Sequence, residues 1–177
     1  MGLTMPNVYV SFYEKGITAI QRAQRGIIAM VFPVNNPNDN ITTIYTVDDI
    51  PEEWTKYKKE QVELALKGYQ TAPRKVLVME CQGEVTSTVP KSGGGTEEQV
   101  TEADFAPILK KLEHIYFNWL VIPGIKDKYT EKIASWVKGM RTTKDTKVCA
   151  VLPNTAADQE GIVNFTNTTI KTKAKTF

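Results

Sequence analysis

Short runs of consecutive apolar residues recur along the chain, and each has the length of a β-strand. The clearest runs are residues 27–34, 119–122, 148–152 and 76–79, the last within an expected strand at 75–81. Because these runs are apolar on both faces, they predict strands that are covered on both sides, as in a largely parallel sheet. A β-branched run at 41–46 and another at 162–172 predict two further strands, while 85–89 is compatible with a small hairpin strand.

Amphipathic segments between these runs predict helices. Two apolar stripes have the spacing of three or four residues that buries one side of a helix. The first stripe comprises Phe105, Ile108, Leu109 and Leu112, and the second comprises Tyr129, Ile133, Trp136, Val137 and Met140. A further helix is expected over residues 51–67, with Pro51 in its first position and Gly68 as its stop.

Polar residues mark the expected helix starts. Thr46, followed three residues later by Asp49, predicts a capping box that opens a short helical turn. In the same way, Thr101 and Asp104 predict the start of the helix that carries the first stripe. Acidic residues 52 and 53 fall in the first turn of the 51–67 helix, where the helix dipole favours negative charge.

The order of these segments predicts an α/β fold, with a largely parallel or mixed sheet flanked by helices, because strands and helices alternate. An extended N-terminal β arm precedes it. Its alternating side chains are Val8, Val10 and Phe12 on one face and Tyr9, Ser11 and Tyr13 on the other. Residues 17–26 stay ambiguous, since Ile17 and Ile20 fit a helix but Arg-Gly ends the segment. We therefore expect an arm at 1–16 and one α/β domain at 17–177.

Composition and charge exclude several classes of function. The 177 residues are 41% hydrophobic and 24% charged, which is ordinary for a globular domain, and no apolar run is long enough for membrane insertion. The net charge is +2, and Lys171, Lys173 and Lys175 supply more than this, so the remainder carries one net negative charge. A nearly neutral body lacks the basic face that nucleic-acid binding requires.

Candidate chemical groups are few and scattered. His114 is the one histidine, and Cys81 and Cys149 lie inside apolar runs, which indicates packing in a reducing cytoplasm rather than a zinc site or a nucleophile. Residues 92–95 are glycine-rich but lack the ending of a phosphate-binding loop. We expect no catalytic residue, metal or cofactor. Arg22 and Arg25 fit either an ion pair across an interface or a solvated loop.

Five short blocks suggest a family. They are QRGIIAMVF at 24–32, VDDIPEEW at 47–54, YFNWLVIPG at 116–124, IASWVKGMR at 133–141, and VLPN with EGIVNFT between 151 and 166. In content and order these blocks resemble the bacteriophage contractile tail sheath family, which occurs in phages, prophages and phage-tail-like bacteriocins. None of the blocks is a catalytic signature.

The resemblance implies a structural role. A subunit of this family polymerises with other sheath subunits around an inner tail tube protein, above a baseplate, and contracts to drive the tube through a cell envelope. Neighbouring subunits exchange β arms, and residues 7–13 match the donated arm. The implied location is a virion tail or a tail-like particle, assembled in the bacterial cytoplasm.

Two further expectations follow. Sheath subunits are usually much longer, which implies that the family's C-terminal portion, with its tube-facing surface and second arm, lies beyond this sequence. The alternative function is a small α/β enzyme or nucleotide-binding module that uses the carboxyl ends of its parallel strands.

Overall fold

The computed structural model describes residues 26–68, 71–90 and 96–166, without the side chains of 86–90 and 96–101. Its elements are β1 (Ile27–Val34), β2 (Thr42–Ile44), η1 (Val47–Asp49), α2 (Lys56–Lys67), β3 (Lys75–Pro90), β4 (Thr96–Ala103), α3 (Ala106–Leu112), β5 (Trp119–Val121), α4 (Asp127–Thr143), β6 (Cys149–Pro153) and β7 (Ile162–Phe165). The strand order is β2-β3-β1-β5-β6-β7, and β4 pairs with β3. The N-terminal arm, Arg22, Arg25 and the lysine tail all lie outside the described residues.

The predicted α/β fold with a mixed sheet is confirmed. Strand β1 pairs in parallel with β3 and β5, and β6 pairs in parallel with β5 and β7. Strands β2 and β4 are both antiparallel to β3. Helix α2 lies in the connection between the parallel strands β1 and β3, and α4 joins β5 to β6, whereas a loop at 154–161 joins β6 to β7. The two antiparallel pairs come from a short return and a hairpin.

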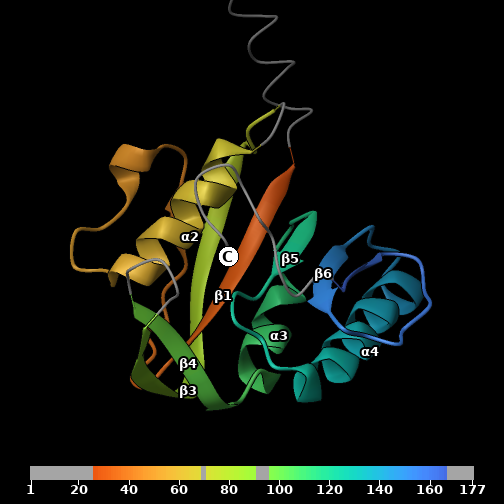
Figure 1. Cartoon of the computed structure of the whole chain (residues 1–177). Coiled ribbons are helices and arrows are strands. Elements are labelled where there is room, and N and C mark those ends of the chain that lie inside the picture. The colour runs from red at the N-terminus through yellow and green to blue at the C-terminus, as the bar shows by residue number, and fades with distance from the viewer. Residues whose placement is uncertain (1–25, 69–70, 91–95, 167–177) are drawn as a thin grey trace, which may run out of the picture.

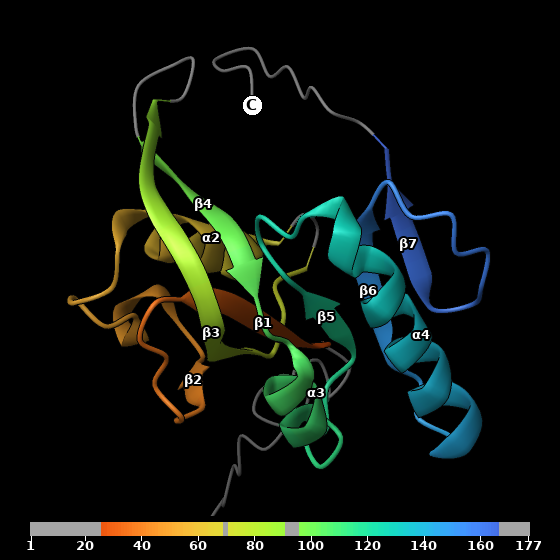
Figure 2. The same cartoon turned by 90° about the horizontal axis from the view of Figure 1, so that it is seen from below.

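Helices cover the two faces of the sheet unequally. On one face, α3 and α4 pack on alternate strand residues such as Ala29, Leu77 and Leu120. On the other face, α2 packs on Met30 and Val78. Figures 1 and 2 show α2 beside β3 and β1, on the opposite side of the sheet from α4. This arrangement follows from right-handed crossovers, because the chain moves from β1 to β3 in one direction and from β5 to β6 in the other.

Two predicted helix starts are wrong. Helix α2 begins at Lys56 rather than at Pro51, because the side chain of Thr55 accepts a hydrogen bond from the Lys58 backbone N–H at 3.3 Å. Residues 52 and 53 therefore lie in a turn that precedes the helix. Thr101 belongs to β4, and α3 starts only after Asp104, whose Oδ1 accepts from the Ala106 N–H. Both helices therefore begin several residues later than the sequence predicts.

Other predicted elements are confirmed in position and differ in length. The capping box of Thr46 and Asp49 is present at η1, and the hydrogen bonds from the Thr46 and Tyr45 backbones keep the pKa of Asp49 below its ordinary value. Strand β2 is shorter than predicted, and β7 ends at Phe165. Strand β3 is far longer than predicted, because it continues into a hairpin with β4 that projects from the sheet (Figure 2).

Gly161 is expected to be intolerant of substitution. Its φ is +90°, and a Cβ there would lie 2.8 Å from Cδ of Arg141 and 3.0 Å from the Val148 carbonyl oxygen. Gly161→Ala should therefore lower the free energy of unfolding by about 1–3 kcal/mol, as measured by urea denaturation. Gly139 is the matched control, since it lies within α4 and its Cβ would meet nothing within 4 Å. Gly139→Ala should raise the free energy of unfolding by about 0.5–1 kcal/mol, and equal effects at both sites would contradict the prediction.

Candidate functional site

The carboxyl ends of the parallel strands are where α/β folds bind ligands. Near this edge, α4 begins at Asp127, and Nδ2 of Asn154 lies 3.4 and 3.5 Å from the two oxygens of its carboxylate. The neighbouring Thr155 is buried, and its backbone exchanges hydrogen bonds with the side chain of Asn164. A carboxylate already occupies the electropositive end of this helix, so the helix is poorly suited to bind a phosphate group. This geometry does not favour a nucleotide site.

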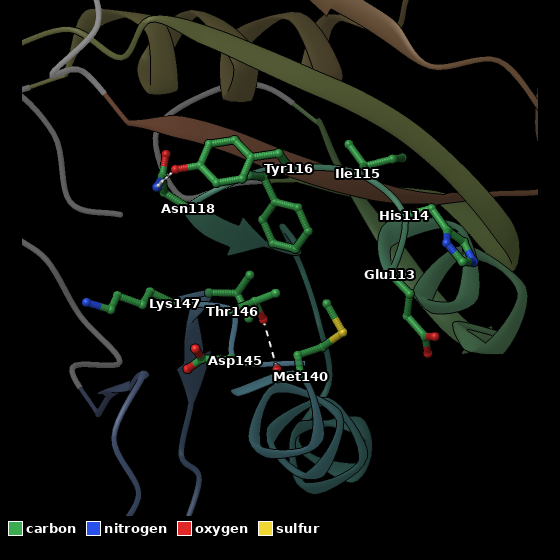
Figure 3. Close-up of a pocket in the computed structure, with 11 residues that line it drawn as sticks. Glu113, His114, Ile115, Tyr116, Asn118, Met140, Asp145, Thr146 and Lys147 are labelled. Atoms are coloured by element: carbon green, nitrogen blue, oxygen red, sulfur yellow. Dashed lines mark hydrogen bonds between the residues drawn. The ribbon is translucent and has the colours of Figure 1, made fainter. Parts of the chain in front are cut away.

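A cavity of about 520 Å³ lies at the opposite edge, where the α3–β5 and α4–β6 connections meet. Buried Phe117, Met140 and Val148 contribute apolar lining. Figure 3 shows Glu113 and His114 on the α3 side of the cavity, with Asp145 and Lys147 across from them.

The polar groups of this cavity have structural partners. Thr146 donates a hydrogen bond from Oγ1 to the Met140 carbonyl at 2.9 Å. Lys144 donates to Glu113 at 2.7 Å, and this hydrogen bond keeps the pKa of Glu113 below its ordinary value. Glu113 is thus held ionised at neutral pH as part of an ion pair, which is unsuited to a general acid. The lining contains no cysteine, serine or metal cluster.

Cys81 is unsuited to act as a nucleophile. Cys81 is buried in the core, and burial raises the pKa of its thiol to about 12. Its thiol is therefore neutral at physiological pH, whereas a nucleophile requires the thiolate. Cys149 lies at the start of β6, and both cysteines are free. Within residues 26–166, apart from the undescribed gaps, no three His, Cys, Asp or Glu side chains gather where they could hold a metal ion.

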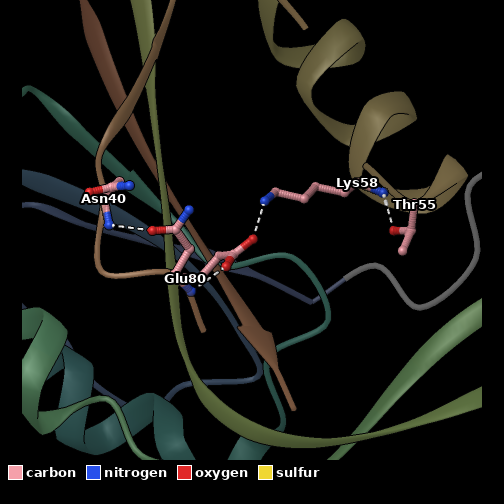
Figure 4. A network of polar contacts seen from close by, with 5 residues as sticks. Asn40, Thr55, Lys58 and Glu80 are labelled. Carbon is pink, nitrogen blue, oxygen red and sulfur yellow. Dashed lines mark hydrogen bonds and ion pairs between the residues drawn. The ribbon is translucent and has the colours of Figure 1, made fainter. Parts of the chain in front are cut away.

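A buried ion pair joins α2 to the sheet. The Lys58 ammonium lies 2.6 Å from Oε1 of Glu80, and their side chains are only 7% and 18% exposed. Oε2 of Glu80 accepts a hydrogen bond from the Asn38 backbone at 2.7 Å, so the same carboxylate also fixes the loop after β1 (Figure 4). Lys58 also lies 3.8 Å from the centre of the Trp54 ring, in a cation–π contact. Every charge here has a partner, and the arrangement is structural.

The aromatic residues divide between core and surface. Trp136 stacks parallel to Phe117 with ring centres 6.5 Å apart, and Tyr129 meets Phe105 edge-on at 5.2 Å. Tyr116 is 75% exposed at the cavity, and Trp119 is also partly exposed. These residues therefore pack in the core or lie at the surface, and they do not form the aromatic and basic platform that would bind a nucleic acid.

The hairpin of β3 and β4 is fixed at its base. The Tyr129 hydroxyl donates to Oε2 of Glu102 at 2.8 Å and accepts from the Ala103 N–H at the same distance. Hydrogen bonds from Lys128 and Tyr129 keep the pKa of Glu102 below its ordinary value. These contacts hold the hairpin against α4. The sequence analysis predicted only a short strand at 85–89 and none of these contacts.

The described residues thus contain structural networks rather than a catalytic arrangement. Their helices include none that is both long and apolar enough to cross a membrane. The predicted site residues of the arm, 8–13, and the two predicted interface arginines lie outside the described residues. They therefore stay predictions.

Comparisons with known proteins show that the chain is similar to proteins of phages and phage-like elements. No family model matches it. A tail sheath protein of Clostridium phage phiCD119 is 27% identical over 164 residues, which are 93% of this chain and 42% of that protein. A protein of the phage-like element PBSX of Bacillus subtilis, XkdK, is 26% identical over 84% of this chain and 35% of its own length. The chain is a relative of phage tail sheath proteins.

Solved structures agree on the fold. The crystal structure of a sheath tail protein from Listeria innocua matches with a TM-score of 0.57 at 15% identity, covering 92% of this chain and 56% of that one. A sheath tail protein from Desulfitobacterium hafniense matches with a TM-score of 0.59 at 14% identity, covering 99% and 59%. The chain spans less than half the length of the two relatives from phage phiCD119 and element PBSX.

Proposed function

We propose that this chain is a structural, non-enzymatic part of a contractile phage-type tail sheath. The observation that carries the proposal is the sequence similarity to a phage tail sheath protein along 93% of the chain. The fold match to two sheath tail proteins supports it independently. The polar groups at both edges of the sheet support it further, because they are engaged in capping, ion pairs and loop fixation rather than arranged around a reacting atom.

The proposed assembly is a polymer of sheath subunits around an inner tail tube, attached to a baseplate. Contacts between unlike surfaces that do not close on themselves generate such extended assemblies. Residues 7–13 act as the arm that adds a strand to the sheet of a neighbouring copy, with main-chain hydrogen bonds joining the two chains. Contraction is the transition of this lattice between two packings, with the arms as hinges. Assembly takes place in the bacterial cytoplasm, and the product is a virion tail or a tail-like particle.

The proposal predicts that one proline in the arm stops assembly without unfolding the domain. Val10→Pro removes a backbone N–H and a ladder hydrogen bond from the centre of residues 7–13. In the intact sheath subunit, Val10→Pro should abolish the tubes or rings that we expect negative-stain microscopy to show for the parent, and deletion of residues 1–15 should do the same. The thermal midpoint of both variants should stay within a few degrees of the parent.

Lys15→Pro is the matched control, because it places the same residue outside the strand. Polymers that persist in Val10→Pro, or an intact subunit that stays monomeric under all assembly conditions, would contradict the proposal. A thermal-shift panel of nucleotides and metabolites tests the enzyme alternative, since a ligand that binds the folded state raises its melting temperature. The sheath proposal predicts a flat panel.

A further inference from the structure

One half of a sheet face has no helix over it among the described residues, and only Val121 at its margin packs against the core under α2. On the α2 side, strand registers place Trp119 beside Cys149, Val121 beside Val151 and Val163, and Pro153 beside Phe165. Register with Met30, which packs under α2, identifies this side of the sheet. Trp119, Val163 and Phe165 are 37%, 46% and 42% exposed. We call these seven residues of β5, β6 and β7 the bare face; none of them carries a charge.

The crossovers explain why the bare face exists. The connection from β1 to β3 places α2 over those two strands, and the connection from β5 to β6 places α4 on the opposite side. No connection among the described residues returns across β5, β6 and β7 on the α2 side. Sheets of this class normally carry helices on both faces, because each face is apolar and must leave water.

We propose that residues 17–25 of the same chain pack on the bare face as an amphipathic helix. The attachment point supports this occupant. The segment enters the domain at Gly26, where an added Cβ would lie 3.7 Å from the Trp119 ring. The Asn118 side chain accepts the Ile27 N–H at 2.7 Å, which fixes the start of β1 beside β5. A segment that ends at Gly26 therefore begins its path next to the first residue of the bare face.

The length of the segment also fits. Nine helical residues span about 14 Å. The five residues of β6 span roughly 16 Å, so a helix antiparallel to the strands covers them from end to end. Helices in a layer lie about 10 Å apart, or two strand spacings, which places a neighbour of α2 over β5 and β6.

The residue pattern divides the segment into two sides. In a helix, one arc comprises Ile17, Ala19, Ile20 and Ala23, and the opposite arc comprises Thr18, Gln21, Arg22 and Arg25. Gln24 is the one polar residue of the first arc, at the end next to Gly26. Two isoleucines fill space over the valine row, while two alanines allow close approach to the sheet. This arrangement places Arg22 and Arg25 toward solvent and leaves residues 1–16 as the free arm.

Disulfide trapping in dilute, monomeric protein tests the inference. In a Cys149→Ser background, Ile20→Cys is paired in turn with Val121→Cys, Val151→Cys and Val163→Cys, which form one row across the strands. At least one pair should oxidise to an intrachain disulfide, seen by mass spectrometry and as a monomer on a non-reducing gel. Arg22→Cys with the same three partners is the matched control, and it should react about tenfold less, because its Cβ points away.

Each other outcome overturns the inference. Interchain disulfides would show that a second copy covers the bare face. Equal or absent trapping from Ile20→Cys and Arg22→Cys would show that the segment takes no fixed position there. A second measurement avoids dependence on cysteine geometry: Ile20→Asp should increase binding of a hydrophobic dye severalfold, whereas Arg22→Asp should not. Because these experiments use monomers, they can contradict the position of residues 17–25 without contradicting the proposed sheath assembly. Loss of the sheath proposal would likewise leave this inference untouched.

Discussion

Glu80→Leu is expected to lower the free energy of unfolding by about 3–5 kcal/mol. The substitution leaves the Lys58 ammonium, whose side chain is almost fully buried, without its counter-charge 2.6 Å away. It also removes the acceptor for the Asn38 backbone N–H. The Trp54 ring still faces the ammonium, but a cation–π contact contributes only about 0.5–2 kcal/mol. Urea denaturation followed by circular dichroism measures the loss.

The control is the double variant Lys58→Met and Glu80→Leu. It removes both charges and keeps most of the apolar volume, so no unpaired buried charge remains. Its free energy of unfolding should recover to within about 2 kcal/mol of the parent, since a buried ion pair and an apolar pair of similar size are often equivalent. A loss below about 1 kcal/mol for Glu80→Leu alone would mean that Lys58 reaches water when its partner is removed.

Leu120→Ala is expected to cost about 2–5 kcal/mol. Leu120 lies in β5 between Ala29 of β1 and Ala150 of β6, and all three are fully buried in the core that α3 and α4 cover. In this row of strand residues a single large side chain separates two small ones. The variant would place three alanines side by side, and neither neighbour can extend to fill the space.

Leu64→Ala is the matched control for this cavity, because the same atoms are removed from α2 at a position 59% exposed. Its free energy of unfolding should change by no more than about 0.5 kcal/mol, as for most surface substitutions. If the two variants lost similar stability, the row would not be close-packed, and the order of the strands in the sheet would need revision.

The apolar runs predicted the central strands well because burial on both faces leaves an unbroken signal. Residues 27–34 coincide with β1, and the stripe at Ile133, Val137 and Met140 is the buried side of α4. Helix starts were harder to predict, because several polar residues can cap and only tertiary packing selects one, as Thr55 shows at α2. The length of β3 was missed for a related reason: its outer half leaves the core to pair with β4 and loses the apolar pattern.

The candidate site was less accessible to prediction. No pattern in the sequence indicated that Lys58 would be buried against Glu80, since the two lie 22 positions apart. Alternate residues 119, 121, 149 and 151 point to the same face of the sheet, and all of them belong to the bare face. The sequence does not distinguish this face from the covered one, because a continuous apolar run predicts that both faces are covered.

The parallel direction of the strands has a mechanical consequence. Strands β1, β5, β6 and β7 all run in the same direction. Gly26 therefore lies at the amino end of these strands, and Thr166 lies at their carboxyl end. A pull applied between these two points acts along the strands and loads the hydrogen bonds of each ladder in shear, all together, instead of peeling them one after another. The domain is thus oriented to resist stretching between Gly26 and Thr166.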